Sequence, residues 1–445
     1  MFAGKTHLSL YEKYYIIAHS VCNEVHVYIR KKEKKSVSMK KLFEKWNSIS
    51  LILRIVCGLV IGVILGLVVP QATGIAILGD VFVGALKAIA PLLVFFLSIS
   101  ALCHAGKSHG GIIKTVIIMY MFSTFLAALV AVIASRLFPV TLTLADAATD
   151  MAAPDGIVEV LKTLLMNMVA NPVSSLLNAN YIGVLTWGVI IGVGMRAAND
   201  TTKKVLDDIS NGLSQVVSWI ISMAPFGILG LVFSSISSNG LEIFSEYGKL
   251  LLVLVGSMLF VYFVTNPIIV FWCIRKNPYP LIFKCLKKSA ITAFFTRSSA
   301  ANIPVNMKAC EEWGMDKDTY SVTIPLGATI NMDGAAITIT VMTLAAANTL
   351  GIHIDFLSGI VLSILATLAA CGASGVAGGS LLLIPMACSL FGISNDIAMQ
   401  IVGVGFIIGV IQDSVETALN SSSDLLLSAS AEFRQWRLEG KEIKY

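Results

Sequence analysis

The octapeptide Gly327-Ala-Thr-Ile-Asn-Met-Asp-Gly334 places an amide and a carboxylate between two glycines, inside a long apolar region. Glycine weakens a helix by about 1 kcal/mol relative to alanine, and a carboxylate inside a bilayer is costly unless it is paired. We therefore expect the helix that carries this octapeptide to be unwound at its centre. Backbone carbonyls that are freed by the unwinding can bind a hard cation.

The region around the octapeptide combines buried acidic residues with a lack of basic ones. It includes Asp333, Asp413, Glu416 and Asp424. No lysine or arginine lies between Lys317 and Arg434. Because an unpaired charge is expensive to remove from water, we expect the neutralising charge to come from outside the protein. Small cations and the ammonium group of a substrate are the candidates.

The composition indicates a polytopic membrane protein in a lipid bilayer. Hydrophobic residues make up 56% of the 445 positions and charged residues 13%, whereas a soluble domain has about 25% charged residues. The net charge of +5 comes from short basic clusters beside apolar segments, so it does not indicate nucleic-acid binding. The eight cysteines are scattered without a CxxC pair, and we expect them to be packing residues.

Apolar segments of about 20 residues, the length that spans a membrane, divide the first part of the chain. They lie at about 49–70, 76–103, 112–138, 181–198, 206–237 (broken near Pro225) and 248–274. A less apolar stretch, 139–180, separates the third from the fourth. The basic residues that flank these segments fall on one side of the membrane if both termini are cytoplasmic. Residues 1–38 have no apolar core of a signal peptide, and Met39 is an alternative initiator.

Two later segments are interrupted by short tips, which indicates re-entrant hairpins. Residues 289–311 are apolar on both sides of Thr296-Arg-Ser-Ser-Ala-Ala-Asn302, and residues 356–391 are apolar on both sides of Cys371-Gly-Ala-Ser-Gly-Val-Ala-Gly-Gly-Ser380. Backbone that is not helical survives at membrane depth only where it is buried in protein or lines a cavity. The tips therefore predict a site between them, although small residues at either place are also typical of close helix packing.

Each predicted hairpin is followed by a helix with polar groups. The first of these helices carries the octapeptide. The second carries polar residues three or four positions apart, which places them on one face: Asp413, Glu416, Thr417, Asn420 and Asp424. A hairpin followed by a broken or polar-striped helix, occurring twice, is typical of an inverted-repeat transporter with its site near the midplane of the membrane.

These motifs resemble a known family. They are similar to those of the dicarboxylate/amino acid:cation symporters, which have the glutamate transporter fold, at 296–299, 324–334, 371–380 and 413–424. The resemblance covers about residues 45–430. Within the family, residues 294–305 and 412–420 are most similar to bacterial members that couple serine and threonine to sodium.

The resemblance implies an all-α protein of the bacterial inner membrane with about eight transmembrane helices, two re-entrant helical hairpins and inverted repeats. It also implies a homotrimer, in which a hairpin-bearing domain slides against a scaffold. The expected parts are a cytoplasmic extension (1–45), a mainly scaffold region (46–280), a transport core (281–432) and a cytoplasmic tail (433–445). The third helix and the latter part near 206–274 are expected to contribute to the transport domain.

The resemblance further implies an amino-acid site, in which Asp413 binds the substrate ammonium group with help from the Thr417 hydroxyl. The remaining contacts come from the side chain of Asn420, from backbone N–H groups of Ser298 and Ser299, and from carbonyls of Arg297 and Val376.

Three sodium sites made of oxygen ligands, which suit a hard cation, are implied as well. The first uses carbonyls of Gly327, Asn331 and Asn420 with the carboxylate of Asp424. The second uses carbonyls of Thr329, Ala370, Cys371 and Ala373. The third uses Tyr120, Ser123, Thr124, Asn331 and Asp333. Sodium is then a co-transported substrate, and no cofactor is expected.

The chain departs from the acidic-substrate members of the family where the substrate side chain would lie. Those members have an arginine at the position of Glu416, an aspartate at Gly409 and a threonine at Ala335. A substrate carboxylate beside Glu416 would meet a like charge. A small hydroxyl group can instead hydrogen-bond to Glu416 or Ser380, so we expect serine and threonine as substrates, with alanine weaker.

Other interpretations of the same residues stay open. Asn331 and Asn420 are also typical of hydrogen-bonded contacts between helices, and Arg297 of a cap on carbonyls near the first tip. Sodium- or proton-coupled transport of another amino acid or a dicarboxylate would use the same architecture, and a cation channel would share the oxygen-lined sites. An intramembrane protease is disfavoured, because no histidine lies near the serine-rich tips and no GxGD motif occurs. No catalytic residue is expected.

Overall fold

The computed structural model describes residues 49–103, 111–144, 157–373 and 378–443. These residues form helices and contain no β-strand, so the all-α fold class is confirmed. The chain divides into two compact units, Met1–Arg54 and Ile55–Tyr445. The expected N-terminal extension, 1–45, lies outside the described residues.

The first half of the chain contains plain helices and two irregular places. Its helices are α2 (Leu51–Val68), α3 (Ile77–Cys103), α4 (Gly111–Leu137), α5 (Ile157–Met168), α6 (Pro172–Leu177), α7 (Tyr181–Gly194), α8 (Asp200–Ser222), α9 (Ala224–Asn239), α10 (Ile243–Phe260) and α11 (Asn266–Ile274). The expected break near Pro225 is confirmed, because α8 ends and α9 begins on either side of Met223. A π-helical turn, Val261–Thr265, joins α10 to α11.

The second half contains the two hairpins and the helices that follow them. Its helices are α12 (Tyr279–Cys285), α13 (Ile291–Thr296), α14 (Ser299–Glu312), α15 (Lys317–Ile330), α16 (Asp333–Thr349), α17 (Phe356–Ala370), α18 (Ile384–Ser389) and α19 (Asn395–Leu438). A π-helical turn, Leu286–Ala290, joins α12 to α13, and a 3₁₀ turn, Gly379–Leu383, precedes α18. We call Tyr279–Glu312 hairpin 1 and Phe356–Ser389 hairpin 2.

The helices match the expected membrane spans. Within the described residues, six helical segments are long and apolar enough to cross a membrane, and shorter apolar helices occur at Tyr181–Ala197, Phe356–Ala370 and Gly379–Ser389. The eight expected spans correspond to α2, α3, α4, α7, α8 with α9, α10 with α11, α15 with α16, and α19. Large apolar side chains such as Ile61, Leu252 and Trp272 are exposed, as expected for a surface that faces hydrocarbon.

The stretch 139–180 contains two helices that the sequence did not predict. The first, α5, buries Val160 and exposes apolar residues such as Val158 and Leu165. The second, α6, begins with Pro172 and is capped by the side chain of Asn171, which accepts hydrogen bonds from the next turn. Both helices pack against α7.

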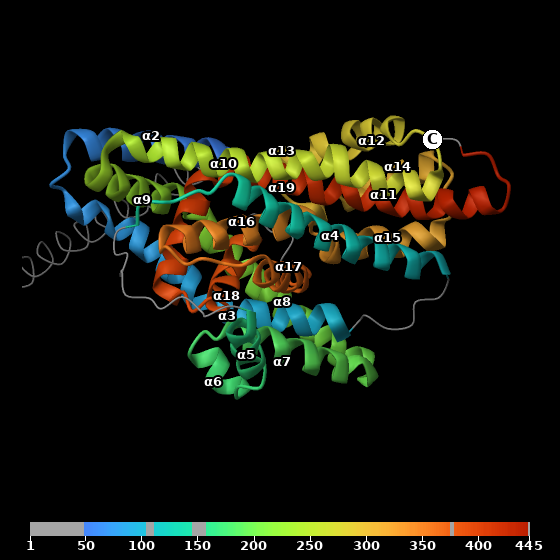
Figure 1. Ribbon diagram of the computed structural model, residues 1–445, viewed down its shortest axis with the longest axis horizontal. Helices are drawn as coiled ribbons and strands as arrows, with labels where there is room; N and C mark the ends of the chain where they lie inside the picture. Colours follow the sequence, from blue (N-terminus) through green and yellow to red (C-terminus); the bar gives the residue numbers. More distant parts are fainter. Residues whose placement is uncertain (1–48, 104–110, 145–156, 374–377, 444–445) are drawn as a thin grey trace, which may run out of the picture. The chain divides into compact units, whose positions relative to one another are not determined.

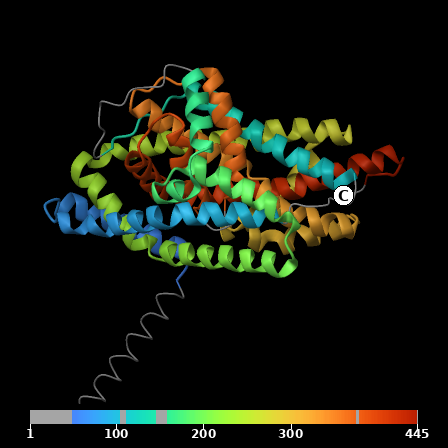
Figure 2. The same ribbon diagram turned by 90° about the horizontal axis from the view of Figure 1, so that it is seen from below.

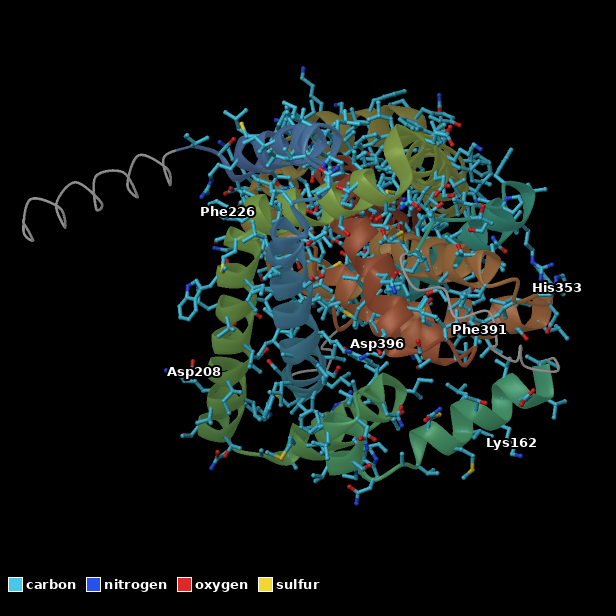
Figure 3. All side chains as sticks on the ribbon, turned by 90° about the vertical axis from the view of Figure 1, so that its left-hand side faces the viewer. Lys162, Asp208, Phe226, His353, Phe391 and Asp396 are labelled. Carbon is cyan, nitrogen blue, oxygen red and sulfur yellow. The ribbon has the colours of Figure 1, made fainter. Side chains whose placement is uncertain are left out.

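The core of the second unit is built around α16 and α19. Helix α19 runs alongside α10, α11 and α16 (Figure 1), and all residues of α16 from Asp333 to Ala347 are buried. In the earlier part of the chain, α3 packs against α7, α8 and α9 (Figure 2). Figure 3 labels Phe391 and Asp396, which lie on either side of the turn that leads from hairpin 2 into α19.

Candidate substrate and cation site

The octapeptide is unwound at its centre, as its sequence predicts. Helix α15 ends at Ile330, α16 begins at Asp333, and Asn331 and Met332 between them have non-helical backbone angles. The two glycines allow close approach of α19. A Cβ atom at Gly327 would lie 2.8 Å from Asp424 Oδ1, and one at Gly334 would lie 2.9 Å from the Glu416 Cα atom. No side chain fits at either position without moving α19 or its carboxylates.

The tip of hairpin 1 forms a helix N-terminus beside α19. Arg297 adopts the left-handed conformation, with φ of 52°, which is uncommon for a residue other than glycine. Ser298 caps α14 by accepting a hydrogen bond from the N–H group of Ala301. The free N–H groups of such a terminus favour an anion. Ser299, the first residue of α14, is buried.

The polar face of α19 is buried along its whole length. The exposed fractions of its five predicted site residues are 3% for Asp413, 6% for Glu416, 6% for Thr417, 3% for Asn420 and 1% for Asp424. Each of these groups therefore has to find partners inside the protein or in what binds there.

Asp413 has a basic partner within the chain, so the expectation that it lacks one is wrong. Arg297 Nε lies 2.6 Å from Asp413 Oδ2, and both side chains are at most 10% exposed. A second guanidinium nitrogen donates to the Gly409 carbonyl at 3.3 Å, and the Gly378 N–H group of hairpin 2 donates to Asp413 Oδ1 at 3.0 Å. The tip of hairpin 1 folds back onto α19 and places the Arg297 guanidinium beside Asp413. Arg297 precedes Lys317, so it lies outside the stretch that has no basic residues.

Asp333, Glu416 and Asp424 form no ion pair within the described residues. Neutral donors surround Glu416 instead. Its Oε2 atom accepts hydrogen bonds from Thr338 at 2.7 Å, from Ser380 at 2.9 Å and from Gln412 at 2.5 Å. These donors come from α16, from hairpin 2 and from α19 itself, and they leave Oε1 as the acceptor for a ligand.

Asp333 and Asp424 each lie among oxygen atoms of neighbouring helices. Ser123 and Thr124 of α4 donate to Asp333 at 2.8 and 3.2 Å. Asn331 Nδ2 donates to Asp424 Oδ1 at 2.9 Å, and the Tyr120 hydroxyl donates to the Asp424 carbonyl at 2.9 Å. The structure thus brings the residues of the third implied sodium site together with part of the first.

One atom of this cluster fits a bound cation directly. Asn331 Oδ1 is buried and has no hydrogen-bond partner in the part of the chain that the structure describes. A buried amide oxygen without a donor is costly, and a hard cation would satisfy it. The donor set around Asp333, Asp424 and Asn331 consists of oxygen atoms and therefore suits sodium.

The remaining predicted residues are placed as follows. Asn420 Oδ1 accepts from the Gly334 N–H group at 2.7 Å, and Asn420 Nδ2 donates to Met332 Sδ at 3.5 Å. The second N–H of Nδ2 is the donor available to a substrate carboxylate. Thr417 donates to the Asp413 carbonyl.

Cys371 lies near the unwound segment, with its sulfur 3.6 Å from the Ile330 carbonyl. Thr329 is exposed, whereas Ala370 and Ala373 are buried. Val376 lies outside the described residues.

The sequence did not single out three residues that complete the site: Thr338, Gln412 and Gly378. Thr338 lies four residues after Gly334 and Gln412 lies four residues before Glu416, so helical spacing from known polar positions was the available signal. A cavity of about 960 Å³ between α4 and α10 lies elsewhere and is lined mainly by apolar residues such as Val130, Leu137 and Phe260. It offers no carboxylate to an amino acid.

Two hairpin tips, an unwound helix and buried oxygen atoms around unpaired carboxylates define a secondary transporter with cation sites. The comparisons with known proteins agree. The sequence model of the sodium:dicarboxylate symporter family matches residues 51–432, and the chain belongs to that family.

Named relatives match nearly the whole chain. A serine/threonine transporter SstT of Streptococcus thermophilus is 59% identical over 400 residues, which are 90% of this chain and 100% of the relative. One of Streptococcus agalactiae is 60% identical over 88% of this chain and 98% of the relative. One of Bifidobacterium adolescentis is 56% identical over 92% of this chain and 95% of the relative.

Proposed function

We propose that this protein carries small neutral amino acids, with serine and threonine preferred, together with sodium. The environment of Glu416 is the observation that carries the choice of substrate. A carboxylate held by three neutral donors, with no lysine or arginine paired to it, repels an acidic substrate side chain and accepts a hydrogen bond from a hydroxyl group. The names of the relatives, serine/threonine transporters, support this choice.

In the proposed site, Asp413 binds the substrate ammonium group and Asn420 Nδ2 binds the α-carboxylate. The N-terminus of α14, at Ser298 and Ser299, adds backbone N–H groups to the same carboxylate. The ammonium group takes the place of the Arg297 guanidinium on Asp413, while carbonyls at Arg297 and Val376 complete its shell. The substrate hydroxyl donates to Glu416 Oε1, so alanine, which cannot donate, binds more weakly.

Sodium neutralises the carboxylates that have no basic partner among the described residues. Asp333 with Tyr120, Ser123, Thr124 and Asn331 forms one proposed site. Asp424 with Gly327, Asn331 and Asn420 forms a second, and Thr329 with Ala370, Cys371 and Ala373 forms a third. Because Asn331 belongs to the unwound segment, a cation bound there orders the backbone beside the substrate. Sodium and substrate then each raise the affinity of the other, which is a coupling free energy.

The larger arrangement follows the resemblance to the family. Residues 281–432, with α4 and the later part of 206–274, form the proposed transport domain, and the rest of 46–280 forms mainly a scaffold that associates as a homotrimer. The protein lies in the bacterial inner membrane with both termini, including the tail 433–445, in the cytoplasm. Alternating access results when hairpin 2 closes over the loaded site and the transport domain slides.

The substrate choice is tested by competition in proteoliposomes. Labelled serine is supplied under an inward sodium gradient, with unlabelled threonine, alanine or aspartate in tenfold excess. We expect threonine to compete strongly, alanine less and aspartate not at all. Aspartate that competes better than threonine, or that is itself taken up faster than serine, would overturn the assignment.

A further inference from the structure

Asn266 is buried next to the Asp333 cluster, inside the candidate membrane span Ala224–Ile274, at a place where the regular helix is interrupted. It is the first residue of α11, it follows the π-helical turn Val261–Thr265, and its exposed fraction is 0%. Pro267 comes next and has no N–H group, which leaves the Phe263 carbonyl free to accept a hydrogen bond from the Tyr279 hydroxyl at 3.2 Å. Such π-helical turns are frequent at functional sites.

The Asn266 amide shares a hydrogen-bond donor with Asp333. Ser123 Oγ lies 2.8 Å from Asp333 Oδ2 and 3.1 Å from Asn266 Oδ1. A hydroxyl group has a single proton, so Ser123 donates to one of these acceptors at a time. Asn266 Nδ2 is buried and has no partner within the described ranges. The Asn266 amide therefore makes fewer hydrogen bonds than it could. The Ser123 hydroxyl can donate its proton either to Asp333 Oδ2 or to Asn266 Oδ1.

We propose that Asn266 is a positioning residue of the sodium site at Asp333 and accepts the Ser123 proton when sodium binds. The residues that the family resemblance implies for this site do not include it. A cation between Asp333 Oδ2 and Ser123 Oγ repels a proton that points along the line joining them. The hydroxyl turns to Asn266 Oδ1, and this frees lone pairs of Ser123 and Asp333 for the cation. The inference rests on the proposed sodium coupling.

The alternative role of Asn266 is a simple contact between helices. Polar contacts of this kind in membrane proteins contribute on the order of 0.6 kcal/mol, and their loss lowers stability equally with and without sodium. The positioning role differs, because it acts only when the cation is bound. A measurement of sodium binding in the absence of amino acid and of transport therefore separates the two roles.

The experiment measures the melting temperature of the purified full-length protein in detergent as sodium replaces choline at constant ionic strength. Asn266→Leu keeps the branched shape of the side chain but removes the acceptor. We expect its half-saturating sodium concentration to rise about tenfold, which corresponds to the loss of one hydrogen bond to a charged cluster. Asn266→Asp keeps the acceptor and adds negative charge, so its half-saturating concentration should equal or fall below that of the wild type. The control Thr340→Val removes a buried hydroxyl elsewhere on α16. It should leave the half-saturating sodium concentration unchanged.

A double-mutant cycle with Ser123→Ala supplies the decisive comparison. Without the Ser123 hydroxyl, Asn266→Leu should change sodium binding by less than twofold. Half-saturating sodium that is unchanged in Asn266→Leu, or effects of the two substitutions that simply add, would overturn the inference and leave the proposed function intact. A wild-type protein that sodium does not stabilise would overturn both.

Discussion

The two re-entrant hairpins are held to α19 in different ways. Both arms of hairpin 1 are anchored by neutral amides, in addition to the ion pair that Arg297 at its tip forms with Asp413. Asn302 Nδ2 donates to Ser421 Oγ at 2.8 Å and to Ser289 Oγ at 2.9 Å, and Asn306 Nδ2 donates to the Ser421 carbonyl at 2.9 Å. Asn302 and Asn306 are at most 1% exposed. These bonds tie both arms of hairpin 1 to each other and to α19.

Hairpin 2 reaches α19 through the carboxylates of the proposed substrate site. Its Gly378 N–H group bonds to Asp413, and its Ser380 hydroxyl bonds to Glu416. Its first arm, α17, packs on α4 and α16, and its second arm, α18, packs on α16 and α19, whereas α12, α13 and α14 of hairpin 1 all pack against α19. In the proposed site a substrate therefore changes both of these hydrogen bonds of hairpin 2, whereas in hairpin 1 it displaces Arg297 at the tip and leaves the amide anchors of the arms in place.

We propose that this difference makes hairpin 2 the gate. Anchors made of neutral amides persist whether or not a substrate is bound, so hairpin 1 stays with α19. A substrate that binds Asp413 and Glu416 replaces the hydrogen bonds of hairpin 2 to these two carboxylates. Binding of the substrate is then coupled to closure of hairpin 2. Both hairpins meet at Asp413, because Arg297 of hairpin 1 and Gly378 of hairpin 2 bond to its two oxygens.

Removing the negative charge of Asp413, which both hairpins contact, should have the largest effect on serine uptake. In Asp413→Asn the substrate ammonium group loses its counterion and Arg297 is left buried without a counterion, which costs about 3–5 kcal/mol. We expect sodium-driven serine uptake to fall more than 100-fold. Stabilisation by sodium should persist, because Asp333 and Asp424 are unchanged. Uptake within tenfold of the wild type would show that Asp413 does not bind the substrate.

A substitution at the second contact of hairpin 2 ranks next. Glu416→Arg replaces an acceptor with a group that only donates, so the donors Thr338, Ser380 and Gln412 lose their partner. Serine uptake should fall about 100-fold, because two to three buried donors lose about 1 kcal/mol each. Glu416→Gln keeps one acceptor oxygen and should lose less than tenfold. Equal activity of the two variants would argue against a role for the acceptor.

The contribution of hairpin 1 to Asp413 is tested by Arg297→Gln. Without the guanidinium group, the substrate ammonium no longer has to displace an ion pair, and serine affinity at saturating sodium should rise about tenfold. Isothermal titration calorimetry in detergent measures the serine affinity. The matched variant Arg297→Lys keeps a positive charge and should stay closer to the wild type. If serine binds more weakly to Arg297→Gln than to the wild type, the guanidinium assists the substrate and does not compete with it.

A matched pair of hydroxyl deletions gives the smallest effects and the sharpest contrast. Ser421→Ala loosens hairpin 1 and should lower the melting temperature without changing the rate of serine release. Ser380→Ala loosens hairpin 2 and should speed serine release about three- to fivefold, which corresponds to the loss of one hydrogen bond. Its melting temperature should stay unchanged. Stopped-flow dissociation and thermal melting measure the two quantities. The same pattern in both variants would remove the distinction between the hairpins.

Local features of the fold were predictable from the sequence. Both hairpin tips, the break near Pro225 and the unwound Asn331-Met332 follow from glycine, proline and polar residues inside apolar runs, because each signal acts within a few residues. The polar face of α19 follows from spacing alone. The roles of individual ligands stay predictions, since no bound substrate or sodium tests them.

Contacts between distant segments were not predictable from the same signals. Arg297 and Asp413 are 116 positions apart, and nothing in the local pattern of either indicates the other. Asn266 was missed because a single asparagine in an apolar helix gives no periodic signal. The helices α5 and α6 were not predicted, because the stretch 139–180 is too polar for a membrane span.

The central claim is that the cargo supplies the positive charge that Asp333 and Asp424 lack. The most direct measurement is serine accumulation in proteoliposomes that contain the wild-type protein, under an inward gradient of sodium or of potassium at the same membrane potential. The account predicts accumulation above equilibrium with sodium and none with potassium. Equal accumulation with both ions would contradict it.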